Sequence, residues 1–263
     1  MEGHNLLTAR AQYEQEKGMT LRIAMWSGPR NISTAMMRSW ENRPDCRVVD
    51  EPFYAYYLHK TKSPHPMFDE VLASQTASFE EVAKNMSIGF CDRPLQYQKH
   101  MTQHMLENCD LSWTKNLRHC MLIRDPAFVV NSYTNSRGEC CAEDIGIKRQ
   151  FELFQAISEL TGQDIPIVDS MAVLNNPEKV IPAMCAALNI ECKEETKHAM
   201  LNWPAGRRES DGAWAEHWYH SVDKSTGFGE AKKQTLNLTP AQLAVVDEVM
   251  PFYEQMKEKA LLV

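Results

Sequence analysis

The sequence has no run of about 20 apolar residues, the length that a helix needs to cross a bilayer. Residues 1–18 are polar and lack the apolar centre of a secretory signal, so we expect a polar N-terminal extension there, with no role in function. No Cys-x-x-Cys pair occurs among the eight cysteines. Because disulfides persist mainly in exported proteins, the sequence predicts reduced thiols, a cytoplasmic location and no membrane partner.

Basic residues are in the minority. The 28 Lys and Arg residues stand against 35 Asp and Glu residues, which gives a formal net charge of −7. Since nucleic-acid-binding proteins are usually basic, we expect no nucleic-acid partner. With 43% hydrophobic residues the chain is too apolar to be disordered, and 263 residues can bury a sizeable core. Composition does not specify an oligomeric state.

Positive charge is nevertheless concentrated in two segments. Residues 22–47 hold five Arg against two acidic residues, and residues 115–137 hold four basic residues against one. Each segment begins at or beside the end of an expected strand. The sequence therefore predicts an acidic protein with one focused basic pocket for a small anionic ligand.

Short apolar runs alternate with helical patterns along the chain. This alternation predicts an α/β fold in which helices cover both faces of a mostly parallel sheet, in a single domain over residues 19–263. A long functional loop is expected over residues 202–229. The expected strands are 21–27, 46–50, 95–99, 120–124 and 165–169, and the expected helices include 33–43, 66–88, 147–160, 177–188 and 240–259.

The clearest local pattern is a strand, a short loop and then a helix. Such a turn presents the N–H groups of a helix N-terminus, where they and the helix dipole favour an anion. Ser33 or Thr34 is expected to cap the helix, and a plain capped turn is the non-functional alternative. The Walker A ending Gly-Lys-Ser/Thr is absent. The candidate binding residues are Gly28, Pro29, Arg30, Asn31, Ile32, Ser33 and Thr34.

A second basic element follows the strand expected over residues 120–124. Arg124 lies at its carboxyl end, where ligands bind in open α/β sheets, and Ser132 follows eight residues later on the next helix. The two side chains can converge on one phosphate. The alternative is that Arg124 pairs with a carboxylate such as Asp125.

Together these elements resemble the sulfotransferase family, whose members use 3′-phosphoadenosine-5′-phosphosulfate (PAPS). Residues 30–34 match the family's first motif, which holds the 5′-phosphosulfate, with Arg30 in place of the usual Lys and Ile32 in place of an inner Gly. Arg124-Asp125-Pro126 and Ser132 match the motif that holds the 3′-phosphate. The resemblance covers residues 21–190 and is nearest to the bacterial sulfotransferase-like branch.

The resemblance implies a P-loop-like three-layer fold that binds PAPS and transfers its sulfuryl group to a hydroxyl or amine of a small molecule. No metal is implied. Arg30 is the candidate that stabilises charge on the leaving phosphate oxygen. Arg207 and Arg208 are a loose analogue of a late family segment near the 3′-phosphate. The alternatives are a non-catalytic nucleotide-binding protein of the same fold and a P-loop small-molecule kinase.

Two candidates compete for the base that accepts the acceptor's proton. Glu51 follows the strand over residues 46–50 and is slightly favoured by position, although burial would have to raise its pKa. The pair Lys99-His100 resembles the family's Lys-Thr-His without the Thr, and a His titrates near neutral pH unaided. The four-residue spacing of His100 and His104 also fits two metal ligands on a helix, but no further ligand pattern accompanies it, and we predict no metal site.

Overall fold

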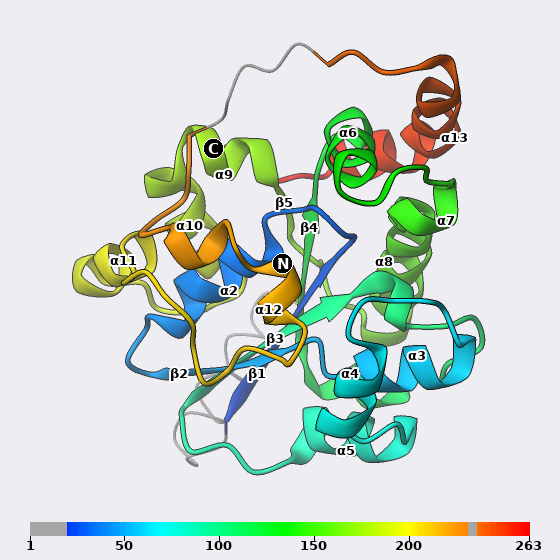
Figure 1. The fold of residues 1–263 in the computed structure, drawn as a ribbon. Coiled ribbons are helices and arrows are strands. Elements are labelled where there is room, and N and C mark those ends of the chain that lie inside the picture. The colour runs from blue at the N-terminus through cyan, green and yellow to red at the C-terminus, as the bar shows by residue number, and fades with distance from the viewer. Residues whose placement is uncertain (1–19, 231–235) are drawn as a thin grey trace.

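The structure, a computed structural model, describes residues 20–230 and 236–263. Five strands form one sheet in the order β2–β3–β1–β4–β5, and each hydrogen-bonded pair is parallel (Figure 1). The expected parallel sheet is thus confirmed. Its strands are β1 (Leu21–Ser27), β2 (Cys46–Asp50), β3 (Leu95–Met101), β4 (Arg118–Ile123) and β5 (Ile167–Asp169).

Helices cover both faces of the sheet (Figure 1). Strand β1 shows why, because successive side chains of a strand point to opposite faces. Ile23 and Met25 pack into one apolar cluster, whereas Ala24 and Trp26 pack into the other. The first cluster is covered by α2 (Ser33–Glu41), α9 (Ser170–Asn175), α10 (Pro177–Ala187) and α11 (Glu194–Leu201), and the second by α6 (Pro126–Arg137), α7 (Ala142–Ile145), α8 (Ile147–Thr161) and α13 (Pro240–Lys257).

The segment between β2 and β3 differs from the expectation of one helix over residues 66–88. It contains α3 (Tyr54–Thr61), α4 (Phe68–Ser74) and α5 (Phe79–Ile88). The break has a local cause, because the Ser78 side chain accepts a hydrogen bond from the Glu81 N–H and so begins a new helix. Within the same break, Gln75 accepts from the Ala55 N–H and donates to the Glu51 carbonyl.

The remaining elements lie mostly in connections. The long connection over residues 202–229 is confirmed and holds only α12 (Ala215–Trp218) and the 3₁₀ turn η3 (Val222–Lys224). Two further 3₁₀ turns, η1 (Thr102–His104) and η2 (Ser112–Asn116), follow β3. At the start of α13, Thr239 forms a reciprocal capping box with Gln242.

The topology creates a crevice at one edge of the sheet. All five strands end at that edge, and the chain leaves β1 for α2 on one face but leaves β4 for α6 on the other. Since the two connections diverge, a space opens between the carboxyl ends of β1 and β4, where open α/β sheets bind their ligands.

Two expectations from the sequence stay predictions. The extension over residues 1–18 lies outside the described residues, and the single domain stays a prediction.

All eight cysteines are free thiols. Within residues 20–230 and 236–263, none of the helices combines the length and apolar character that a bilayer crossing requires.

Replacing Gly28 by alanine is expected to destabilise the fold by about 1–3 kcal/mol, the usual range for overpacking. A Cβ at Gly28 would lie 2.8 Å from the carbonyl oxygen of Ile145, so the α7 backbone would have to move. Urea unfolding measures the loss. Gly229→Ala is the control, because a Cβ there meets nothing within 4 Å. Equal free energies of unfolding for the two variants would contradict the close approach.

Candidate active site

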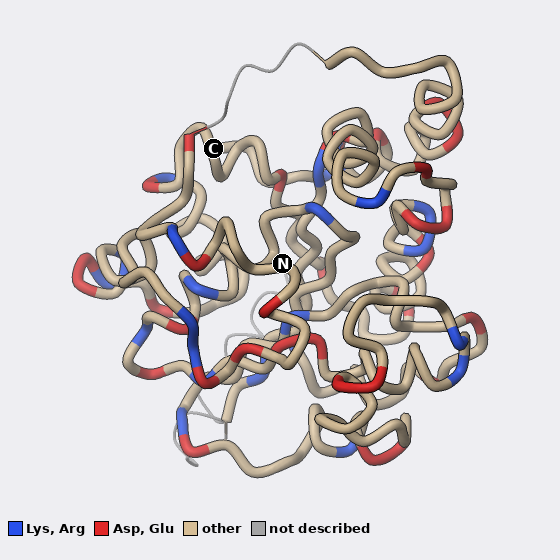
Figure 2. The backbone as a smooth tube through the Cα atoms, viewed as in Figure 1, with Lys and Arg blue, Asp and Glu red and all other residues tan. Residues whose placement is uncertain are grey.

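A cavity of about 470 Å³ lies at the carboxyl edge of the sheet. The segments that follow β1, β2, β3 and β4 line it, together with α6 and the 202–229 connection. Acidic and basic residues are interspersed over the outer layers (Figure 2), whereas the described residues of the lining include four Lys or Arg residues against one carboxylate. The cavity is therefore suited to an anion. These residues are Arg30, Lys99, Arg124 and Arg137, against Glu51.

Helix α2 begins at the wall of this cavity. Its N-cap is Ile32, in the left-handed conformation and with no side-chain cap, so the expectation of a Ser33 or Thr34 cap is wrong. Ser33, Thr34 and Ala35 form the first turn and line the cavity. Because the first N–H groups of a helix have no partner within it, this turn offers donors and a positive dipole end to an anion.

The loop before α2 is held in an unusual backbone conformation. Arg30 and Ile32 have φ values of 58° and 38°, and a positive φ is unfavourable for a β-branched residue. The loop is tied to the end of β4 on two sides. The Asn31 amide donates to the Leu122 carbonyl at 2.5 Å, and Arg124 Nη1 donates to the Arg30 carbonyl at 2.6 Å. These contacts with the sheet keep the loop open toward the cavity.

The two predicted phosphate elements meet in the structure. Arg30 Nε donates to Ser132 Oγ at 3.0 Å, which links the first loop to α6. Burial and the neighbouring Arg137 lower the pKa of Arg30, while burial and the neighbouring Arg30 lower the pKa of Arg124. Arg124 Nε is buried and has no hydrogen-bond partner among residues 20–230 and 236–263. Repelling guanidinium groups with a spare buried donor are an arrangement that a bound anion would stabilise.

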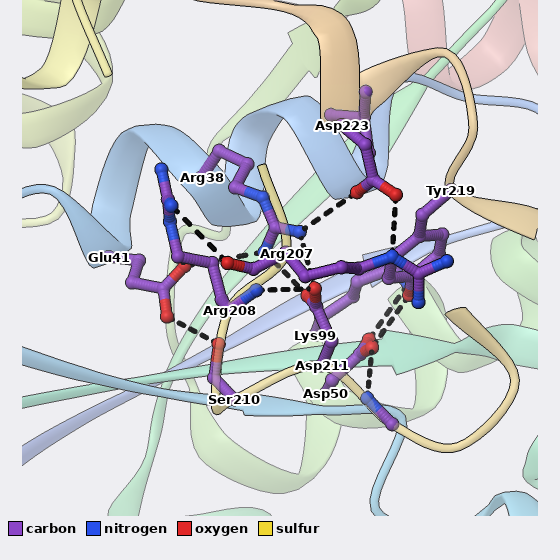
Figure 3. A network of polar contacts seen from close by, with 12 residues as sticks. Arg38, Glu41, Asp50, Lys99, Arg207, Arg208, Ser210, Asp211, Tyr219 and Asp223 are labelled. Atoms are coloured by element: carbon purple, nitrogen blue, oxygen red, sulfur yellow. Dashed lines mark hydrogen bonds and ion pairs between the residues drawn. The ribbon is translucent and has the colours of Figure 1, made fainter. Parts of the chain in front are cut away.

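Lys99 is engaged by the protein itself (Figure 3). Its Nζ donates to Asp50 Oδ1 at 2.9 Å and to the Tyr219 hydroxyl at 2.6 Å. It also donates to Glu51 Oε1 at 2.6 Å. Burial disfavours the ammonium, but the two carboxylates outweigh burial and raise its pKa well above the usual value. An ammonium has three N–H donors, and all three are used. In this structure Lys99 holds Glu51 rather than offering a free donor to a ligand.

Glu51 is the carboxylate of the cavity wall. It follows β2 with φ 41°, and its backbone N–H donates to the Lys99 carbonyl at 3.0 Å, which fixes the direction of the side chain. Burial raises the pKa of Glu51 above its usual value, against the opposing effect of Lys99. A buried carboxylate with a raised pKa beside a ligand cavity has the properties of a general base.

His100 does not reach the cavity. Lys99 and His100 are consecutive residues of β3, so their side chains point to opposite faces of the sheet. The His100 ring stacks on Trp26 with 4.5 Å between centroids and bonds Gln98 at 3.0 Å. Burial lowers its pKa to about 3, so it stays neutral. The structure thus separates the two candidate bases, and because residue 100 belongs to a strand, the helical spacing with His104 does not apply.

Arg207 and Arg208 also lie away from the residues that line the cavity. Arg207 Nε bonds Asp223 Oδ2 at 2.5 Å, and Arg208 Nε lies 3.8 Å from Glu41 (Figure 3). The same network contains Arg38 of α2, which is 1% exposed and pairs with Glu41, Asp211 and Asp223. Its role in the structure is to fasten the 202–229 connection onto α2.

Several cavity residues escaped the sequence analysis. Arg137 was counted only as part of a basic segment, although its position four residues after Tyr133 places both on one face of α6. Trp218 and Tyr219 belong to the connection over residues 202–229, which we expected to be functional, but its weak periodicity did not show which of its side chains line the cavity. The sequence pattern does not single out Tyr54 and His65, which also line the cavity, and it draws attention to His104 only through its spacing from His100.

Comparisons with known proteins extend these observations. The sulfotransferase domain family matches residues 21–260. Two relatives from Arabidopsis thaliana, the branched-chain-amino-acid aminotransferase-like proteins 1 and 2, are 29% and 28% identical over 235 and 244 residues. The matches cover 89% and 91% of this chain but 41% and 43% of those relatives. The chain therefore spans less than half the length of the curated relatives that it matches.

Solved structures share the fold. A sulfotransferase from Alicyclobacillus acidocaldarius matches 92% of this chain and 97% of its own, with a TM-score of 0.50 and 7% identity. The sulfotransferase domain from the curacin biosynthetic pathway matches 88% of this chain and 98% of its own, with a TM-score of 0.51 and 13% identity. At such identities the likeness concerns the fold, and it confirms the expected three-layer α/β architecture.

Proposed function

The chain belongs to the sulfotransferase domain family, and from this premise we propose that it transfers a sulfuryl group from PAPS to a hydroxyl or amine of a small molecule. The observation that carries the proposal is the cavity itself. Its lining combines a helix start that has no side-chain cap with several guanidinium groups. The one carboxylate in the described lining, Glu51, pairs with Lys99 rather than with a guanidinium group. Such a lining suits a ligand with several negative charges.

The residues present fit a nucleotide with two phosphate positions. Arg30 and the first turn of α2, with Ser33 and Thr34, would hold the 5′-phosphosulfate end. Arg124 and Ser132 would hold the 3′-phosphate, since both line the cavity and Arg124 Nε is a buried donor without a partner in the part of the chain that the structure describes. The other loop residues, namely Gly28, Pro29, Asn31 and Ile32, shape the backbone around this end.

His100, Arg207 and Arg208 have no place in this proposal. His100 is enclosed by aromatic rings on the other face of the sheet, and the two arginines are paired with carboxylates outside the cavity. Lys99 keeps an indirect role, because it orients the Glu51 carboxylate and remains positively charged beside it.

The chemistry assigns one task to each group. When bound, PAPS supplies the sulfuryl group and leaves as the bisphosphate. Arg30 neutralises the charge that grows on the leaving phosphate oxygen as the old S–O bond breaks. Glu51 accepts the proton that the acceptor loses as its oxygen or nitrogen forms the new bond to sulfur. Lys99 keeps Glu51 in place and favours its ionised form, and the proton passes from Glu51 to solvent after transfer.

Adenosine 3′,5′-bisphosphate (PAP) is expected to stabilise the protein, whereas ATP with Mg²⁺ is not. At about 100 times its Kd the ligand should add about 2.7 kcal/mol to the free energy of unfolding. Thermal unfolding measures the shift in Tm. A shift with ATP and Mg²⁺ alone would favour the kinase, and no shift with PAP would overturn the proposal.

A variant pair locates the bisphosphate. Arg124→Ala should remove most of the PAP-induced shift, because it deletes the proposed 3′-phosphate contact. Arg47→Ala is the matched control, since Arg47 pairs with Asp92 on the surface and its side chain is 52% exposed. Equal shifts in the two variants would show that Arg124 does not contact the ligand. PAP binding without transfer to any acceptor would favour the non-catalytic nucleotide-binding protein.

A further inference from the structure

One cation of the cavity is not needed by either end of the proposed donor. Arg137 is the last residue of α6 and lines the cavity. Its Nη1 donates to His65 Nε2 at 3.4 Å and to the Tyr133 hydroxyl at 3.3 Å. Among residues 20–230 and 236–263, no carboxylate lies within ion-pairing distance of Arg137. Arg137 is thus a cation that points into the cavity and whose hydrogen-bond partners, His65 and Tyr133, are neutral.

The guanidinium of Arg137 is also fixed in orientation. Its Cζ lies 4.5 Å from the centre of the Trp218 ring and 5.3 Å from that of Tyr133. Aromatic contacts of this kind hold a planar guanidinium by its faces. Nη1 is used by His65 and Tyr133, whereas Nε and Nη2 have no hydrogen-bond partner among residues 20–230 and 236–263. An edge with parallel N–H donors matches the two oxygens of a carboxylate.

Arg137 faces the same part of the cavity as Glu51. Its partner His65 bonds the Tyr54 hydroxyl at 2.7 Å, and the Tyr54 backbone N–H donates to the Glu51 carbonyl. The Arg137 charge also acts on Glu51, whose pKa it lowers against the larger effect of burial. A group held by Arg137 would therefore lie beside the proposed base, in the part of the cavity left to the acceptor.

The surrounding surface is aromatic. Tyr54, Tyr133, Trp218 and Tyr219 all line the cavity, and they come from α3, α6 and the 202–229 connection. We propose that the acceptor is a small hydroxy acid with an apolar body, whose carboxylate binds the edge of Arg137 while its hydroxyl meets Glu51. This inference rests on the proposed sulfuryl transfer and names the substrate class of the same cavity.

The test uses matched acids and esters on protein saturated with PAP, so that only acceptor binding is measured. The probes are 4-hydroxyphenylacetate and 3-hydroxybutyrate with their methyl esters, titrated by calorimetry. The wild-type protein is expected to bind an acid at least tenfold more tightly than its ester. Arg137→Met should weaken binding of the acid by about 10- to 100-fold and leave the affinities for the ester and for PAP unchanged. Arg137→Lys should fall between, because it keeps the charge but loses the planar edge.

The matched control is Arg47→Met, which removes an exposed surface arginine far from the lining and should leave acid binding unchanged. Urea unfolding checks that both Arg137 variants are folded. If PAP binds but acids and esters bind equally, or neither binds, the hydroxy-acid inference is overturned while the donor proposal stands. If Arg137→Met weakens PAP binding as much as Arg124→Ala does, Arg137 belongs to the donor site and the inference is again overturned. If PAP itself does not bind, the proposed function fails first.

Discussion

Glu51→Gln is expected to slow sulfuryl transfer by about 10²- to 10⁴-fold, the usual contribution of a general base, while PAP binding is unchanged. The amide has the shape of the carboxyl group but cannot accept the acceptor's proton. Lys99 keeps Asp50 and Tyr219 as partners, so the fold is retained. The measurement is a single-turnover experiment with ³⁵S-labelled PAPS and an acceptor that the wild-type protein turns over.

Two comparisons make this result specific. Glu152→Gln is the control, because Glu152 pairs with Arg149 on α8 and is not part of the cavity. His100→Gln should lose far less activity than Glu51→Gln, since burial keeps His100 neutral on the other face of the sheet.

The pH profile adds a separate readout. Burial raises the pKa of Glu51, so wild-type kcat/KM should fall as the pH drops through a value above the usual one, and this limb should vanish in Glu51→Gln. A full transfer rate in Glu51→Gln would exclude it as the base.

The fold was predictable because its signals are local. Short apolar runs, or polar–apolar alternation in the case of residues 95–99, mark the strands, and their alternation with helices implies the parallel sheet. The errors fall where tertiary contacts decide. The break between α4 and α5 depends on Ser78 as a cap and on Gln75, which reaches back to the start of α3. Likewise, Ile32 rather than Ser33 or Thr34 is the N-cap of α2, because the loop is tied to the end of β4 and takes a positive φ.

The site was predictable where sequence spacing sets geometry. The loop around Arg30 and the pair Arg124 and Ser132 each follow a strand, and parallel strands bring such ends together, as the bond between Arg30 and Ser132 shows. Pairing partners were not predictable. Whether a charged residue is free depends on distant carboxylates, as for Arg207 with Asp223. Arg137 was the converse case, because nothing in its neighbourhood along the chain showed that it would line the cavity without a carboxylate partner among the described residues.

The buried group around Lys99 carries the largest expected effect on stability. Lys99 and Asp50 have side chains that are 1% exposed, and Glu51 is 11% exposed. Lys99→Met should reduce the free energy of unfolding by about 3–5 kcal/mol, the cost of leaving buried charges without their partner. The Tyr219 hydroxyl would also lose the donor that helps to hold the 202–229 connection over the strand ends. Urea unfolding at pH 7 measures the difference.

The pH dependence separates this cause from a simple loss of packing. Burial already raises the pKa of Glu51, and Lys99 is the group that opposes the rise, so the variant should have a still higher value. A carboxyl whose folded-state pKa is raised stabilises the fold when protonated and loses that contribution as the pH increases. The difference in the free energy of unfolding between Lys99→Met and the wild-type protein should therefore become smaller as the pH falls from 7 toward 5. Lys197→Met, which breaks the more exposed pair with Glu194, should cost less than about 1 kcal/mol. A loss for Lys99→Met that is equally small, or that does not change with pH, would contradict a buried charge cluster at the base of the cavity.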